Sequence, residues 1–383
     1  MKKGISLILV LAMVLISLSG CSAPAQSQAG APEAEKAPGY KIGIVTPTLS
    51  TSEDEYRAGE NMVAKYPDIV KHITLPENFN VELETAISQI VSLADDPEMK
   101  AVVVVSGQSG LLPALQKIEE TRPEIITVTA PIWDDPDMMA QYIDINLDTD
   151  WARRGQTIVE KAHNMGAKTF IHYSFPTHLA KEAISKRKEM MKTTSEQLGM
   201  TFVEIVTPDP QAGDGGVPAM QQFLREDIPR QIEKYGVDTN IFGSNCPMYD
   251  VILDEALKLK FIMAEQCCPT PTQAFPTVMN LEIAAEDVGN FDKINAMISE
   301  KAADADMTGR LSGWPVPITI FLPEFAVEVA KDLIDSGKTP EEALSSEYLI
   351  ALAQDKFGVG VEMNPMKPEM DNYYLTIMDS IFY

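Results

Sequence analysis

From residue 40 onward, short apolar runs alternate with longer amphipathic stretches. Strand-like and helical patterns follow one another four times before residue 147, beginning with a strand over 41–45 and a helix over 53–65. Apolar residues over 81–93 recur at helical spacing, and the β-branched run over 101–105 is typical of a strand buried on both faces. This alternation predicts parallel strands joined by right-handed crossovers, which is a doubly wound α/β sheet covered by helices.

A second round of the same pattern begins at residue 148. It predicts helices over 151–165, 179–198, 219–235 and 249–258, and strands over 168–173, 201–206, 239–242 and 260–264.

The stretch from residue 40 to residue 383 is longer than one hydrophobic core usually serves, so two lobes are expected. We assign residues 40–147 with about 271–320 to the N-terminal lobe, and residues 148–270 with about 321–383 to the C-terminal lobe. The opening strand should lie near the centre of its sheet. The aromatic C-terminal tail should pack against the body.

The first twenty residues have the order of a secretory signal. Two lysines precede an apolar run over 5–18, which is short for a membrane span, and Leu-Ser-Gly stands before Cys21. This ending resembles the bacterial lipobox, which implies that Cys21 is lipidated and begins the mature chain. Residues 22–39 have the composition of an unstructured tether. We expect an extracytoplasmic protein that is anchored to the cell membrane through lipid only.

The charge balance excludes one class of partner. The formal net charge is -25, and removal of Lys2 and Lys3 with the signal brings it to -27. A body this acidic repels polyanions, and no basic stripe offsets the repulsion, so nucleic acid is not expected as a partner. No helix-turn-helix pattern precedes Tyr40, because the leader and tether occupy that stretch.

Cysteine and histidine, the usual ligands of zinc, are scarce in this chain. After Cys21 the cysteines are Cys246, Cys267 and Cys268, without a C-x-x-C pair, and the chain has only four histidines. We therefore expect no metal site and no cofactor. A disulfide from Cys246 to either of the other two cysteines and three buried free thiols both remain open.

Polar residues follow the predicted strands of both lobes. In an open parallel sheet, ligands bind beyond the carboxyl ends of the strands. Hydroxyls and amides there would orient an uncharged polar ligand, and Trp133 or Tyr173 would stack on a flat ring. Each residue alone is more often a turn residue or helix cap, but their recurrence favours a site. The candidate ligand-binding residues are Thr46, Thr48, Ser50, Ser106, Gln108, Ser109, Pro131, Trp133, Arg153, Tyr173, Ser174, Ser244, Asn245 and Gln266.

Two further patterns leave alternatives open. The stretch 106–110 either cradles a phosphate at the start of the next helix or is an ordinary capped turn, and it lacks the Gly-Lys-Ser/Thr ending of a P-loop. Of Arg153 and Arg154, one either enters the cleft or pairs with Asp148 or Asp150 at the surface, and the other should be solvated.

Catalytic residues do not converge in this sequence. Ser174 lies near His172 and His178, but no Gly-x-Ser-x-Gly elbow surrounds it. We therefore do not expect an enzyme.

Two stretches carry a resemblance to a known family. KIGIVTPTLSTSEDEYRAGENMVAKY contains the opening strand and helix, and YIDINLDTDWARRGQTIVEKAHNMGAK contains a strand, a crossing and a helix. They resemble the type I solute-binding lipoproteins of ABC transporters over most of residues 40–270, and the whole also resembles an uncharacterised lipoprotein subfamily of anaerobic bacteria. The resemblance implies two lobes joined by a hinge that close on a small ligand, after which the closed form docks on a membrane permease.

The opening loop departs from that family. Sugar-binding members present aromatic faces with Asp, Arg and Asn groups there, whereas this chain has Thr46, Thr48 and Ser50. The expected ligand is a neutral polar molecule, nucleoside-like or sugar-like, ahead of a cation and then an anion. We expect a monomer that delivers its ligand to an ABC permease. The alternative is a ligand-sensing receptor that signals to a membrane partner, and an extracellular enzyme comes third.

Overall fold

The computed structural model describes residues 39–78, 81–106, 108–210 and 215–383. The predictions for the signal, Cys21 and most of the tether lie outside the described residues. The chain divides into two units, Met1–Ala37 and Pro38–Tyr383. Three clusters of buried apolar side chains all lie within the second unit, which therefore contains a complete core of its own. In the described ranges, no helix has both the length and the apolar character needed to span a membrane.

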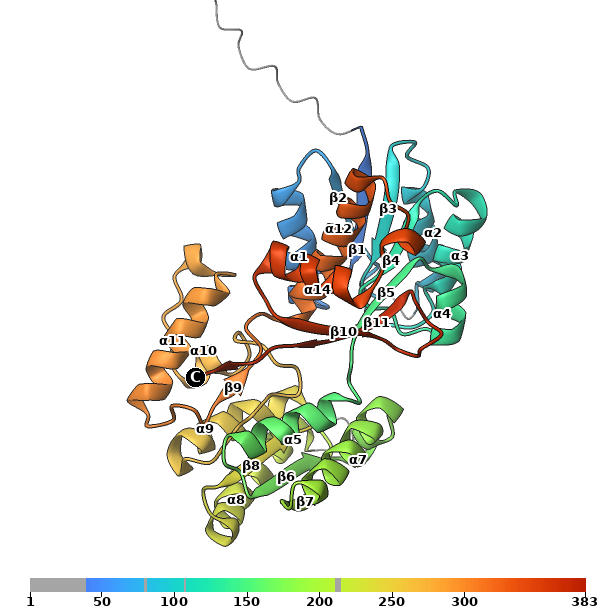
Figure 1. The fold of residues 1–383 in the computed structure, drawn as a ribbon. Coiled ribbons are helices and arrows are strands. Elements are labelled where there is room, and N and C mark those ends of the chain that lie inside the picture. Colours follow the sequence, from blue (N-terminus) through green and yellow to red (C-terminus); the bar gives the residue numbers. More distant parts are fainter. Residues whose placement is uncertain (1–38, 79–80, 107, 211–214) are drawn as a thin grey trace, which may run out of the picture. The chain divides into compact units, whose positions relative to one another are not determined.

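The first lobe is built on a seven-stranded sheet with the order β10-β11-β5-β4-β3-β1-β2 (Figure 1). All neighbours pair in parallel except β10, which runs antiparallel to β11. The predicted doubly wound α/β class is confirmed. The strands are β1 (Lys41–Thr46), β2 (Val70–Thr74), β3 (Met99–Val104), β4 (Ile126–Thr129), β5 (Ile145–Thr149), β10 (Val361–Pro365) and β11 (Tyr373–Met378).

Helices cover both faces of this sheet, and the side chains of β3 show why. Ala101 and Val103 belong to one buried cluster and Val102 and Val104 to another, as expected when successive side chains point to opposite faces. One face is covered by α1 (Glu53–Lys65), α12 (Ile318–Ser336) and α14 (Ser346–Phe357), the other by α2 (Leu83–Leu93), α3 (Leu112–Thr121) and α4 (Pro136–Tyr142), and the short α13 (Pro340–Ala343) precedes α14.

Two details of the first lobe differ from the predictions. The opening strand is second from the edge of the sheet, because the chain places only β2 beyond it before returning to add β3 on its other side. The helix α4 was missed. Its signals are an Asp135 side chain that accepts the Met138 N–H at 3.0 Å and Pro136 in the first turn, but it is only seven residues long.

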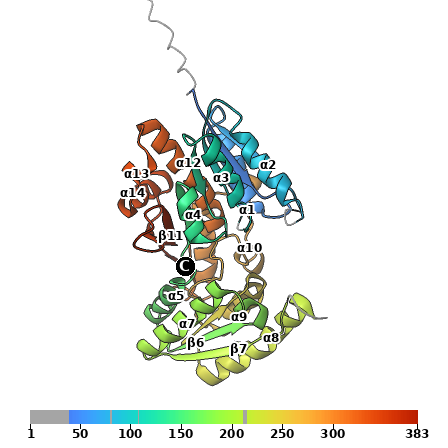
Figure 2. The ribbon, with the colours of Figure 1, turned by 90° about the vertical axis from the view of Figure 1, so that its right-hand side faces the viewer.

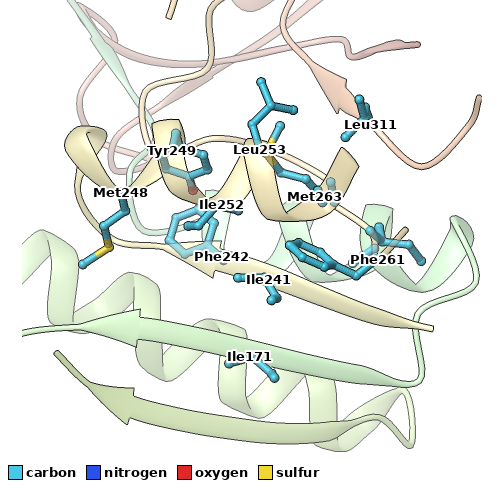
Figure 3. Packing of buried hydrophobic residues seen from close by; sticks show 14 of the residues in the cluster. Ile171, Ile241, Phe242, Met248, Tyr249, Ile252, Leu253, Phe261, Met263 and Leu311 are labelled. Atoms are coloured by element: carbon cyan, nitrogen blue, oxygen red, sulfur yellow. The ribbon is translucent and has the colours of Figure 1, made fainter. Parts of the chain in front are cut away.

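The second lobe contains a parallel three-stranded sheet of β6 (Thr169–Ser174), β7 (Thr201–Val206) and β8 (Thr239–Gly243), with β6 in the middle (Figure 1). Figure 2 shows β6 beside β7. Side chains of β8 pack against the following helix, and Phe242 meets Tyr249 edge-on (Figure 3). The predicted strand over 260–264 is reduced to isolated bridges at Ile262 and Met263. The helices are α5 (Arg154–Asn164), α6 (Pro176–Leu179), α7 (Glu182–Gln197), α8 (Gly216–Tyr235), α9 (Tyr249–Leu259), α10 (Phe275–Val278) and α11 (Phe291–Asp304), with 3-10 turns η1 (Cys246–Met248) and η2 (Ala285–Asp287).

The predicted lobe assignment after residue 270 is wrong, and the two segments are exchanged. Phe275 and Ile298 pack in the core of the second lobe, whereas α12 and α14 pack on the first sheet. The physical reason is that α12 is apolar on most of its surface and needs a broad sheet face, while β11 pairs with the free edge of β5.

The chain crosses between the lobes three times. It leaves β5 for α5, passes from β9 (Ser312–Gly313) to α12, and returns from β11 to β12 (Ile381–Phe382). The strands β9 and β12 pair antiparallel, so the second and third crossings are hydrogen-bonded to each other. Tyr373, Tyr374 and Tyr383 of the aromatic tail are buried, as predicted, whereas Phe382 is 54% exposed.

Candidate functional site

The first sheet has a topological switch point between β1 and β3. From β1 the chain moves to β2 on one side and then returns to β3 on the other, so the connections leave in opposite directions and open a crevice at the carboxyl ends. A pocket of about 330 Å³ lies there, and a second of about 260 Å³ shares Pro47, Thr51, Ser106 and Gln108 with it. The fold therefore places a concavity at the strand ends where the sequence predicts a site.

Four predicted residues line this pocket, namely Ser106, Gln108, Pro131 and Trp133. Backbone hydrogen bonds join the two loops that carry them. The Trp133 N–H donates to the Gln108 carbonyl at 2.8 Å, and the Ser106 N–H donates to the Pro131 carbonyl at 3.1 Å. Trp133 is 51% exposed, so about half of its surface is free to contact a ligand.

The predicted hydroxyls of the β1 loop do not line the pocket. Thr46 is buried, with its hydroxyl 2.7 Å from Nε2 of His72. The Thr48 hydroxyl lies 3.0 Å from that of Ser50, which in turn donates to Glu77. Ser109 likewise donates to the Trp133 carbonyl. These side chains hold the loops in place, and Pro47 is the β1-exit residue that faces the pocket.

The start of α3 does not offer a phosphate cradle. Three successive N–H groups, of Gly110, Leu111 and Leu112, donate to the carboxylate of Asp134 at 2.6, 3.0 and 2.9 Å. Because an internal carboxylate occupies these donors, the described part of this stretch is the ordinary capped turn at the start of α3.

Two buried acids line the pocket and were missed by sequence reasoning. Burial raises the pKa of Glu55 to about 7, against a hydrogen bond from Ser52 that lowers it. Burial likewise raises the pKa of Asp148 to about 7, against the Thr149 N–H, which donates to its carboxylate at 2.6 Å. Acids in an acidic sequence resemble solvated surface charge, and only the fold shows that these two are enclosed.

The remaining lining is largely apolar. Trp151, Ile318 and Leu322 contribute to it together with the prolines of the β1 and β4 loops, and Cys268 reaches it from the second lobe. No lysine, arginine or histidine is found among the described lining residues. The pocket therefore combines flat apolar surfaces with carboxyl and amide groups.

The predicted residues of the second lobe gather elsewhere. The Tyr173 hydroxyl donates to Asp227 at 2.9 Å, and the Ser244 hydroxyl donates to that of Ser174 at 3.1 Å. The Gln266 amide donates to the Gln273 carbonyl at 2.7 Å. These residues, with Asn245 directly before η1, lie at the exits of β6 and β8 or just after residue 264, and none is among the described residues lining the pocket.

The two adjacent arginines have different surroundings. Arg153 pairs with Glu362 at 2.5 Å and is 38% exposed. Arg154 is fully buried, with its guanidinium over the rings of Trp151 and Trp314 at 5.3 and 5.1 Å. The predicted Arg153 is therefore a partly solvated ion-pair residue, and neither arginine lines the pocket.

Glu265 is the anion that accompanies the buried arginine. Its carboxylate accepts from Nε and Nη2 of Arg154 at 2.9 and 2.6 Å, from Nε1 of Trp314 at 3.2 Å, and from Lys161. Burial alone would raise the pKa of Glu265, but Lys161 and Arg154 together hold it below its usual value. This network joins α5, the segment after residue 264 and the second crossing.

The fold also gathers the three described cysteines. Sγ of Cys267 lies 3.4 Å from that of Cys246 and 3.5 Å from that of Cys268, and all three sulfurs lie within 4.8 Å of one another. Sequence spacing was the basis for expecting no metal site. That basis fails, because Cys246 follows β8 and the other two follow residue 264, and the fold brings these exits together.

Residues 40–312 match the profile of the family described as "Protein of unknown function (DUF3798)". The chain belongs to this family. An "Uncharacterized protein" of Treponema pallidum (strain Nichols) is 32% identical over 178 residues, which are 45% of this DUF3798 chain and 80% of the relative.

Solved structures give a second comparison. A chain from Clostridium difficile 630 described as a "Putative transcriptional regulator" is 42% identical with a TM-score of 0.87, and the match covers 90% of this DUF3798 chain and 99% of that one. A sugar ABC transporter structure from Actinomyces odontolyticus ATCC 17982 is 12% identical, with a TM-score of 0.54 and coverage of 80% and 86%. The latter likeness shows the fold alone, and it confirms the predicted type I periplasmic-binding-protein-like architecture.

Proposed function

We propose that this protein is a lipid-anchored, extracytoplasmic receptor that captures a small polar molecule in the switch-point pocket and delivers it to an ABC permease. The observation that carries the proposal is the pocket itself, which lies at the carboxyl ends of β1 and β3 and combines two indole rings with two buried acids. The fold shared with sugar-binding proteins of ABC systems supports a ligand-binding role.

The residues that line the pocket indicate the charge of the ligand. Without a basic side chain in the described lining, an anion would lose its hydration and gain no counter-charge. Ligand hydroxyls or N–H groups can donate to Glu55 and Asp148, and Trp133 offers a flat face for a sugar or base ring. A neutral, ring-containing polar molecule fits best, and a cation comes second.

The three crossings support capture by hinge motion. Each crossing is a short segment between two separately packed cores, which is the arrangement that allows one lobe to rotate relative to the other. A ligand drives closure only if it binds the closed form more tightly. In this proposal, contacts between the ligand and the second lobe make the closed form bind more tightly than the open form. Cys268, which lines the pocket, is the first of these contacts.

The second candidate function is ligand sensing without transport. It is favoured by the description of the similar Clostridium difficile chain as a "Putative transcriptional regulator". The net charge of -25 argues against direct DNA contact by this chain, so sensing would act through a membrane partner. Neighbouring genes for a permease and an ATPase would favour transport, and a kinase gene alone would favour sensing.

A thermal-shift screen of residues 38–383 tests the proposal. The panel contains sugars, nucleosides, amino acids and polyamines, and a true ligand at a hundredfold excess over its Kd should stabilise the protein by ~2.7 kcal/mol. Trp133→Ala should reduce the shift, whereas Tyr142→Ala, at an exposed ring that lines a different pocket, should not. A panel without a single stabilising compound would count against a receptor for these ligand classes.

A further inference from the structure

The three thiols of the second lobe form a compact group at the junction of two loops. Cys246 begins η1, and Cys267 and Cys268 follow Gln266, whose amide is tied to the Gln273 carbonyl. Cys267 is buried and the other two are half-buried. The main-chain carbonyls of Gln266 and Cys267 accept hydrogen bonds from Arg154 at 2.8 and 2.7 Å, and these bonds hold the loop in place.

The sulfur positions match the size of a single metal ion. Zinc–thiolate bonds are about 2.3 Å long, which places the sulfurs of a tetrahedral site about 3.8 Å apart. The observed separations of 3.4 and 3.5 Å, with all three sulfurs within 4.8 Å, surround such a position. Small rotations of the three cysteine side chains would bring their sulfurs to bonding distance from one ion.

A buried arginine without a carboxylate partner packs on the strand that leads to Cys246. Arg187 is 1% exposed, and its Nε and Nη2 atoms have no hydrogen-bond partner. Its guanidinium lies over the ring of Phe242 at 5.1 Å, and Phe242 belongs to β8, the strand that leads to Cys246. Arg154 has Glu265 as its counter-ion, but no ion pair within the described ranges is formed by Arg187. A buried charge without compensation is costly, so an anion is expected here.

We propose that Cys246, Cys267 and Cys268 bind one thiophilic metal ion, with Zn²⁺ as the reference ion. Each thiol binds as a thiolate and releases its proton to solvent, so a divalent ion with three thiolates carries a net charge of -1. That charge balances Arg187. Three protein ligands leave a fourth position open, and because Cys268 lines the switch-point pocket, water or a pocket ligand can reach it. The proposal stands independently of the receptor function.

Titration of residues 38–383 with Cd²⁺ under anaerobic conditions tests the proposal. This segment contains the three cysteines and all three clusters of buried apolar side chains. We expect one equivalent to bind, with the ultraviolet charge-transfer absorption of cadmium–thiolate bonds. Protein loaded first with one equivalent of Zn²⁺ should release that Zn²⁺ when Cd²⁺ is added, and an excess of Mg²⁺ should not change the absorption. Cys268→Ser should lose most of this absorption, and His163→Ala, at an exposed histidine of α5, should retain it.

A second measurement keeps the test decisive if the serine variant does not fold. Alkylation of the wild-type protein should modify the half-buried Cys246 and Cys268 without metal and be slowed at least tenfold by one equivalent of Zn²⁺. Absence of both charge-transfer absorption and alkylation protection would overturn the proposal. So would a disulfide between Cys246 and Cys267 or Cys268 in protein purified from its own cells without added oxidant.

Discussion

Replacement of Glu265 by glutamine tests how the buried ion network holds the region between the lobes. The variant keeps the size and shape of the side chain and removes only its charge. Glu265 is 1% exposed in its side chain, its partner Arg154 is 0% exposed, and Lys161 is 11% exposed. The substitution therefore leaves two enclosed cations without their anion.

The magnitude follows from that enclosure. Removing one partner of a buried ion pair typically costs ~3–5 kcal/mol, because the remaining charge stays desolvated. Here the Arg154 guanidinium would keep its bonds to the carbonyls of Gln266 and Cys267, which offsets part of the loss. We therefore expect Glu265→Gln to reduce the free energy of unfolding by about 3 kcal/mol at neutral pH.

Urea denaturation followed by tryptophan fluorescence measures this loss. A matched control is Asp238→Asn. Asp238 is 39% exposed and pairs with Lys168 and Arg310, which are 79% and 29% exposed, so its ion pairs should contribute no more than ~1 kcal/mol. Because the folded pKa of Glu265 is lowered, its contribution is present above the unfolded value of ~4.3 and is lost as pH falls, so the two proteins should converge in acid. A loss under ~1 kcal/mol at pH 7 would refute the reasoning.

Three further predictions concern the pocket and the helix packing. Trp133→Ala should weaken ligand binding about three- to tenfold by calorimetry and leave the urea midpoint unchanged, because the ring is half-exposed; equal affinity would remove it from the site. The raised pKa of Asp148 in the folded protein means that the wild type should lose stability as pH rises from ~4 to about 7, because the folded state holds a proton that the unfolded state releases. In Asp148→Asn this loss should be smaller. Urea midpoints of the two proteins that run parallel across that pH range would contradict this. Gly155→Ala would place a methyl group 2.3 Å from the Arg187 carbonyl oxygen and should destabilise α5–α7 packing by ~1–3 kcal/mol in denaturation experiments, a result that an unchanged melting temperature would exclude.

The local pattern of apolar residues was sufficient to predict most elements. The helix over 53–65 and the strand over 201–206 have the predicted bounds, because their signals lie within the elements themselves. The lobe assignment after residue 270 could not be obtained in this way. Which sheet α12 covers depends on the face that the rest of the chain leaves uncovered. The pairing of β11 with β5 joins segments that are far apart in the sequence.

The candidate site shows the same limit. Strand exits predicted Ser106, Gln108, Pro131 and Trp133, because the position of a strand end is a local property. Whether an exit side chain faces the pocket or its own loop is decided by partners such as His72 for Thr46, which no spacing rule reveals. Buried acids and a three-cysteine group are likewise products of tertiary contact.

A crystal structure of residues 38–383 with a ligand from the thermal-shift screen tests the central claim most directly. The account predicts ligand density at the carboxyl ends of β1 and β3, with a ring against Trp133 and donor groups directed at Glu55 or Asp148. Density confined to another concavity, such as the one lined by Tyr142 and Pro340, would contradict it.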